Sequence, residues 1–165
     1  MSMTNTCLGT ALSFGLCLKA VAKVEDGERY LYCEPSTEAT DLQGERMLLK
    51  ALEESREYFL KKGNLDLEHY TIRGESLGLP NPRAYEIGRP VDVRFDDGRV
   101  FVKGLVYKGT GPMAERANEF WSSITEMTPP MPWFPSVGGY VAHRGAILPQ
   151  GSSQPVQAIS AVYWN

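Results

Sequence analysis

Apolar and polar residues alternate near the start of the chain, which predicts a β-hairpin. Alternating apolar side chains occupy 16–24, and a second apolar run follows at 30–33. The dipeptide Asp26-Gly27 between them is typical of the tight turns that join antiparallel strands. We therefore predict that the two runs pair with each other, and that residues 1–15 form a flexible N-terminal extension.

The apolar spacing changes to three and four residues after this hairpin, which predicts a helix over 45–62. Lys61-Lys62 and the following Gly63 are typical of the C-terminal end of a helix, where basic side chains and glycine are favoured. A second helix is predicted over 112–126, because a proline opens the segment and apolar residues follow at helical spacing.

Short strands account for most of the remaining chain. Leu65, Leu67 and His69 alternate with acidic residues, which predicts a strand that carries His69 on the same face as the leucines. Further strands are predicted at 91–95, 100–107, 137–148 and 155–164, and the last two follow a proline-rich segment at 128–135.

Together these elements predict an α+β domain of six or seven strands and two helices. Hairpins dominate and no β-α-β alternation occurs, so we expect an antiparallel β-barrel or sheet flanked by the two helices. The length of 165 residues suits one domain, which we assign to 16–165. Because the last predicted strand stops at Trp164-Asn165 without a turn, we expect this domain to be truncated at its C-terminus.

Composition and charge narrow the classes of function. A formal net charge of −3 argues against nucleic acid as a partner. Three cysteines without a C-x-x-C motif argue against a disulfide framework or a structural zinc site, and they fit a reducing, intracellular compartment. No segment approaches the roughly 20 apolar residues that cross a membrane. Since no glycine-rich phosphate loop or dinucleotide fingerprint occurs, we predict no cofactor.

Few residues have the chemistry of a catalytic site. His69 and His143 are the only histidines, and the chain lacks a metal-binding spacing such as H-E-x-x-H. Ser136 is the most unusual serine, because Gly138 and Gly139 follow it and allow a substrate to approach the backbone closely. A serine hydroxyl needs a neighbouring base to act as a nucleophile, and a histidine is the usual one.

Structural interpretations of the same residues stay open when each is taken alone. Ser136 also fits a bulge or the start of a strand after the prolines, and His69 also fits a half-buried strand residue that bonds to backbone. A thiol dyad of Cys33 and His69 is a weaker alternative, because cysteines in apolar strands are usually inert packing groups.

The order of several segments resembles that of the tailed-phage prohead proteases. The front half has D-L-Q-G-E at 41–45, a helix ending in Y-F-L-K-K-G at 58–63, and L-D-L-E-H at 65–69. The back half has V-K-G-L-V-Y at 102–107, a helix that bears an alanine and a tryptophan, and P-S-V-G-G-Y-V at 135–141. The resemblance covers about 16–165, which is nearly the whole predicted domain.

This resemblance implies a serine endopeptidase whose fold is similar to that of the herpesvirus assemblins, a β-barrel flanked by helices. It implies that Ser136 is the nucleophile and His69 the general base, so we expect the two side chains to lie within hydrogen-bond distance. It also implies that backbone amides of Val137, Gly138 and Gly139 stabilise the oxyanion.

The resemblance also implies the setting in which the protein acts. The substrates would be extended segments of capsid and scaffold proteins, cleaved inside the viral procapsid in the host cytoplasm, with no nucleic acid or membrane as a partner. Assembly into a homo-oligomer is left open. We expect the proline-rich segment to form one wall of the substrate groove, because Trp133 and Phe134 offer apolar contacts there.

Two positions depart from the family motif, which is usually G-F-S-[IV]-x-G. Pro135 stands before the serine, and Gly138 stands where an acidic residue is common. The third catalytic group is open between Asn165, His143 and a residue beyond the chain end. His143 is a poor candidate, because an odd offset of seven residues from Ser136 points to the opposite face of an unbroken strand.

Two rival functions stay open, of which the missing third group favours only the first and the second is the weaker. One is a non-enzymatic barrel module that binds capsid or scaffold proteins, and the other is an esterase-like hydrolase that uses the same serine and histidine on small esters.

Overall fold

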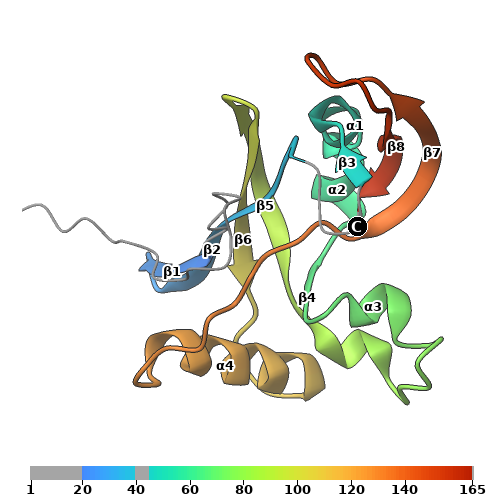
Figure 1. The fold of residues 1–165 in the computed structure, drawn as a ribbon. Helices are drawn as coiled ribbons and strands as arrows, with labels where there is room; N and C mark the ends of the chain where they lie inside the picture. The colour runs from blue at the N-terminus through green and yellow to red at the C-terminus, as the bar shows by residue number, and fades with distance from the viewer. Residues whose placement is uncertain (1–19, 40–44, 165) are drawn as a thin grey trace, which may run out of the picture.

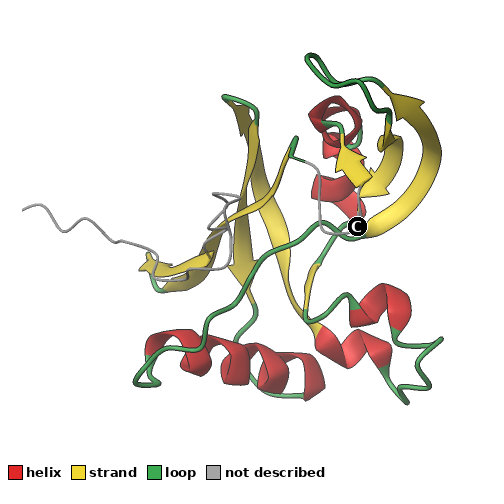
Figure 2. Cartoon of the chain, viewed as in Figure 1, coloured by secondary structure: helices red, strands yellow, loops and turns green. Residues whose placement is uncertain are grey.

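The computed structural model describes residues 20–39 and 45–164, which form an α+β fold (Figure 1, Figure 2). The elements follow in the order β1 (Ala20–Glu25), β2 (Glu28–Thr37), β3 (Glu45–Met47), α1 (Leu49–Glu54), α2 (Arg56–Lys62), β4 (Leu65–Asp66), α3 (Tyr70–Arg73), the 3-10 helix η1 (Pro82–Tyr85), β5 (Glu86–Asp96), β6 (Arg99–Val106), α4 (Pro112–Thr125), β7 (Gly139–Ile147) and β8 (Val156–Trp164).

The described strands form two sheets. The larger one is antiparallel in the order β1-β2-β6-β5-β4, and the smaller one has the order β3-β8-β7 with β3 parallel to β8. The predicted α+β class and antiparallel sheet are confirmed, but the described residues form no closed barrel. The physical reason is that β3 and β7 both pair with β8, so the C-terminal hairpin completes a sheet of its own.

The hairpin predicted at 16–33 is confirmed over its described residues, and the strands predicted at 91–95 and 100–107 pair as a second hairpin; residues 1–19 lie outside the described residues. β1 and β2 are joined at Asp26 and Gly27, and β5 and β6 at Asp97 and Gly98. All four turn residues have positive φ, which is the backbone conformation of the tight turns that match the twist of antiparallel strands. The strand predicted at 91–95 is longer than expected, since β5 begins at Glu86.

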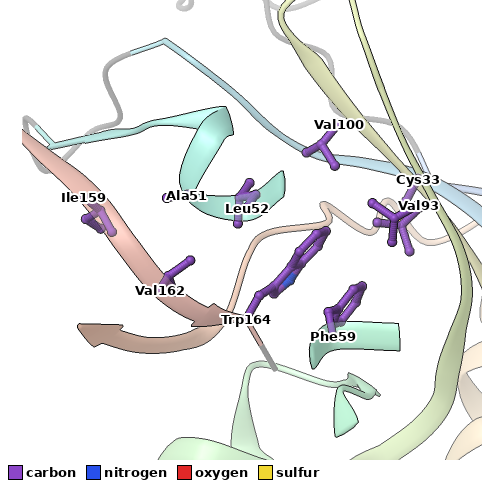
Figure 3. Packing of buried hydrophobic residues seen from close by; sticks show 10 residues of the cluster. Cys33, Ala51, Leu52, Phe59, Val93, Val100, Ile159, Val162 and Trp164 are labelled. Atoms are coloured by element: carbon purple, nitrogen blue, oxygen red, sulfur yellow. The ribbon is translucent and has the colours of Figure 1, made fainter. Parts of the chain in front are cut away.

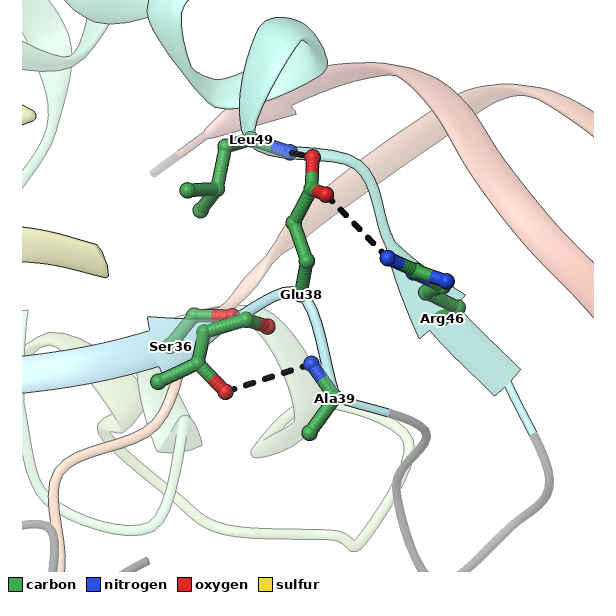
Figure 4. A network of polar contacts seen from close by, with 6 residues as sticks. Ser36, Glu38, Ala39, Arg46 and Leu49 are labelled. Carbon is green, nitrogen blue, oxygen red and sulfur yellow. Dashed lines mark hydrogen bonds and ion pairs between the residues drawn. The ribbon is translucent and has the colours of Figure 1, made fainter. Parts of the chain in front are cut away.

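The single helix predicted over 45–62 is wrong. Its first residues form β3, and the rest divides into α1 and α2 at Ser55. Figure 4 shows why the helix begins late: the Glu38 carboxylate accepts hydrogen bonds from the Leu49 N–H at 3.0 Å and the Arg46 guanidinium at 3.2 Å. The Ser55 hydroxyl accepts the Trp164 N–H at 2.9 Å, which ties the break between the helices to β8.

One hydrophobic core, the α1–α2 core, lies between α1, α2 and β8 on one side and the larger sheet on the other (Figure 3). At the centre of this core the Phe59 ring stacks on the Trp164 ring, with the two ring centroids 3.8 Å apart. Its buried members are Cys33, Ala51, Leu52, Phe59, Val93, Val100, Val102, Ile159, Val162 and Trp164.

A second core, the α4 core, lies where α4 packs against the other end of the larger sheet (Figure 1). Its buried members are Leu31, Ile87, Val106, Ala117, Phe120 and Trp121. Leu31 and Cys33 are two residues apart in β2, so the two cores share one face of this sheet. The site described next lies over the strip of sheet between them.

Candidate active site

Ser136 lies in an extended segment between α4 and β7, and its side chain is exposed. Trp133 fixes one end of this segment, because its indole N–H donates to the Ser123 hydroxyl at 2.8 Å and its ring packs edge-on against Phe120. Gly139 fixes the other end by pairing with Trp164 of β8. The strand predicted from 137 therefore begins two residues later, and Ser136 precedes it.

His69 is not a strand residue. The prediction of a strand that carries His69 on the same face as the leucines is therefore wrong. β4 ends at Asp66, and Glu68 and His69 both have left-handed backbone conformations, with φ of 56° and 55°. His69 is the residue before the short helix α3. The two left-handed residues turn the chain back, so the imidazole lies beside Asp66, which a regular strand would place on the opposite face.

The structure brings His69 and Ser136 together. The His69 Nε2 atom lies 2.7 Å from the Ser136 Oγ atom, across 67 residues of sequence. The prediction that these side chains lie within hydrogen-bond distance is confirmed. A neutral imidazole with its proton on Nδ1 can accept the serine O–H proton at Nε2, which is the tautomer that this geometry favours.

Asp66 completes the arrangement on the other side of the imidazole. Its Oδ1 atom lies 3.5 Å from His69 Nδ1, and its side chain is only 8% exposed. Its Oδ2 atom accepts hydrogen bonds from the Thr71 N–H at 2.9 Å and the Thr71 hydroxyl at 2.6 Å. The carboxylate is thus held with one oxygen toward His69, where it can orient the ring and stabilise a positive charge on it.

Sequence reasoning missed Asp66, although the signal was present. Asp66 and His69 are separated by three residues, the spacing that one turn of chain brings together. The reading of 65–69 as a strand concealed it. His143, one of the three candidates for the third group, instead lies 2.5 Å from the Ser160 hydroxyl, between β7 and β8. Asn165 lies outside the described residues, and a group beyond the chain end stays a prediction.

Gly138 approaches the His69 ring closely. A Cβ atom at this position would lie 2.5 Å from His69 Nδ1, which is shorter than any ordinary contact. A Cβ on Gly139 would lie 2.5 Å from the Tyr163 carbonyl oxygen, so this position too has no room for a side chain. The glycine at 138 therefore has a steric reason in this fold. The role of the Val137, Gly138 and Gly139 amides at an oxyanion stays a prediction.

A cavity of about 320 Å³ adjoins the three side chains. Ser136, His69 and Asp66 line it, and so do Trp133 and Phe134 of the proline-rich segment. The expected position of this segment beside Ser136 is confirmed, and its contact with a substrate stays a prediction. The cavity continues down to the strip of the larger sheet between the two cores.

Cys33 also lines this cavity, but its environment does not favour a thiol dyad. Burial raises the pKa of the Cys33 thiol to about 12. A thiol is nucleophilic only as the thiolate, so Cys33 is inert near neutral pH.

The described residues give no sign of a metal centre or a membrane-spanning helix. No group of three or more histidine, cysteine, aspartate or glutamate side chains in 20–39 and 45–164 is arranged to hold a metal ion. None of the helices in these ranges is both long and apolar enough to cross a membrane.

Comparisons with protein-family models, curated proteins and solved structures give no match to this chain.

Proposed function

We propose that the protein is a serine endopeptidase with Ser136 as nucleophile, His69 as general base and Asp66 as the group that orients His69. The observation that carries this proposal is the placement of the His69 ring between Asp66 and Ser136, with Asp66 Oδ1 3.5 Å from Nδ1 and Ser136 Oγ 2.7 Å from Nε2. Such an arrangement of an acid, a histidine and a serine is the one that activates a hydroxyl for acyl transfer.

The reaction would proceed in two halves. His69 Nε2 takes the Ser136 proton as Oγ attacks the substrate carbonyl, and the Asp66 carboxylate stabilises the resulting imidazolium. The imidazolium then gives its proton to the leaving amine. Water attacks the acyl-enzyme in the second half, again with His69 as the base, and this releases the acid and restores Ser136.

The proposed substrates are extended segments of phage capsid and scaffold proteins, cleaved during prohead maturation inside the procapsid. Support for this setting comes from the order of motifs along the sequence. A fold similar to that of the assemblins belongs to the same proposal, with the open, two-sheet arrangement of this chain as a difference from a closed barrel.

The position of Asp66 beside His69 favours an enzyme over a non-enzymatic binding module. A non-enzymatic binding module was favoured by the lack of a third group, and Asp66 supplies that group. An ester hydrolase would use the same three residues, so the choice of substrate has to separate it from a peptidase.

Hydrolysis of an unstructured protein such as casein, and of a pool of internally quenched peptides, tests the proposal. We expect the wild-type chain to cleave peptide bonds and Ser136→Ala to lose at least about 10³-fold in kcat/KM. Ser160→Ala is a matched control, because it removes a serine hydroxyl that contacts His143, away from Ser136. It should retain wild-type activity. Equal activity of wild type and Ser136→Ala, or turnover of p-nitrophenyl acetate without peptide cleavage, would contradict a peptidase.

A further inference from the structure

The cavity beside Ser136 has a floor built from core residues. Leu31, Ile87 and Val102 line it, and they are 5%, 3% and 3% exposed. Leu31 and Ile87 belong to the α4 core, whereas Val102 belongs to the α1–α2 core. The cavity is therefore the gap between the two cores, and Ser136 stands at its mouth.

None of the charged side chains that line the cavity is available inside it to pair with a charged side chain of a substrate. Glu68 and Arg73 are exposed, which puts them at the rim. Asp66 is occupied by Thr71 and His69. A substrate side chain with a charge would lose its hydration inside and find no partner of opposite charge, which is strongly unfavourable. One free polar atom of the lining is Asn64 Oδ1, a buried oxygen without a hydrogen-bond partner, and it is uncharged.

An apolar side chain of a substrate, by contrast, is stabilised by burial in this cavity. Apolar cavities in proteins hold water poorly and bind apolar groups, because burial of apolar surface is favourable. The volume of about 320 Å³ is at the lower end of the range of roughly 300–1,000 Å³ for ligand sites, which suits one side chain and its flanking backbone.

We infer that this cavity is the specificity pocket of the proposed peptidase and that it takes a large apolar side chain, such as leucine, methionine or phenylalanine. The side chain belongs to the residue whose carbonyl Ser136 attacks, because Ser136 itself lines the cavity. The inference rests on the proposed function and adds the substrate class to it.

Peptidyl diphenyl phosphonates test this directly, because their side chain next to phosphorus occupies the same position. Ser136 Oγ forms a bond to phosphorus, phenoxide leaves, and the serine proton passes to His69. Reaction with wild type is followed as the rate of modification of Ser136 by mass spectrometry. We expect the leucine and phenylalanine compounds to react at least about 10-fold faster than the alanine compound, and faster still than the lysine and aspartate compounds.

Ala20→Leu narrows the cavity, because Ala20 is half-buried on β1 and lines it. Ala22→Leu is the matched control: it lies two residues along the same strand, is also half-buried and packs against the α4 core, but does not line the cavity. We expect Ala20→Leu to reverse the preference in favour of the alanine compound and Ala22→Leu to keep it. Thermal unfolding verifies that both variants fold.

The outcomes separate the inference from the proposed function. Modification of Ser136 at similar rates by all side chains, or fastest by a charged one, overturns the pocket but keeps the peptidase. Absence of any reaction at Ser136 in the folded wild-type chain, together with no peptide cleavage, overturns both. If Ala20→Leu does not fold, the ranking of the compounds on wild type decides alone.

Discussion

At the scale of single residues, the backbone of Glu68 and His69 decides the chemistry. Two successive left-handed residues are costly for side chains other than glycine, and such strain concentrates at functional sites. They turn His69 toward Asp66 on one side and Ser136 on the other. A period-of-two pattern in the sequence carries no sign of this turn, which explains why the strand interpretation of 65–69 identified His69 as a candidate but concealed Asp66.

Substitution of Asp66 tests the role of the buried carboxylate. Asp66→Asn keeps one oxygen for Thr71 but presents a neutral group to His69, so the imidazolium that forms during the reaction loses its stabilisation. We expect kcat/KM for a peptide to fall about 10³–10⁴-fold with little change in KM. Glu75→Gln, the same change at an exposed site in the following loop, should leave the rate unchanged. A fall in kcat/KM of less than 10-fold in Asp66→Asn would show that Asp66 does not act with His69 in the reaction.

The close approach of Gly138 to the imidazole makes a second substitution informative. Gly138→Ala would place a Cβ atom 2.5 Å from His69 Nδ1, so the ring or the backbone at 138 has to shift, and either shift disturbs the placement of the ring beside Ser136. We expect at least about a 100-fold loss of kcat, since misplacement by about 1 Å can cost that much. Gly145→Ala in β7 is the control, because its Cβ would meet the nearest described atom at 3.6 Å, an ordinary contact. Full activity of Gly138→Ala would show that the ring tolerates displacement.

The thiol of Cys33 provides a test of the rival dyad. Because burial raises its pKa to about 12, Cys33 should be protonated at pH 8 in the folded chain and should become reactive only when the chain unfolds. We expect iodoacetamide to modify Cys33 in denaturant but not under native conditions, measured on the Cys33 peptide by mass spectrometry. Rapid native modification that abolishes peptide cleavage would favour a cysteine nucleophile instead.

At the scale of elements, the pair of short helices holds the smaller sheet against the larger one. Phe59 of α2 stacks on Trp164 of β8, and both side chains are nearly fully buried, at 3% and 2% exposed. Both rings also line the cavity, so this contact connects the stability of the fold to the shape of the site.

Truncation of this stack should destabilise the whole domain. We expect Phe59→Ala to lower the free energy of unfolding by about 3–5 kcal/mol, measured by urea denaturation. Phe134→Ala removes the same ring from a position that is 73% exposed, and it should change stability by less than about 0.5 kcal/mol. Similar small effects of both variants would mean that β8 does not depend on α2 for its position.

Elements with long periodic patterns were predictable from the sequence, and short ones were not. The β1–β2 and β5–β6 hairpins and α4 agree closely with the apolar spacing and the turn residues. The helix predicted over 45–62 went wrong at its start, because its first residues pair with β8. The decisive contacts, from Glu38 to Leu49 and from Ser55 to Trp164, join segments that no local pattern relates.

At the scale of the whole molecule, the division into two sheets was the least predictable feature. β3 pairs in parallel with β8 across more than a hundred residues, with Arg46 opposite Ala158. Alternating patterns reveal that a strand exists but not which partner it takes, so a barrel and two sheets fit the same sequence equally well. The order of motifs nevertheless indicated that His69 and Ser136 meet, and their contact is present.

The central claim is that His69 activates Ser136, and reaction with a fluorophosphonate tests it most directly. The account predicts one modification per folded wild-type chain, located at Ser136 by mass spectrometry. The rate should fall about 10²–10⁴-fold in His69→Gln, because the serine loses its base. It should be unchanged in Ser160→Ala, which removes only the contact to His143. No modification of Ser136 in the folded wild-type chain, or an equal rate in His69→Gln, would contradict the account.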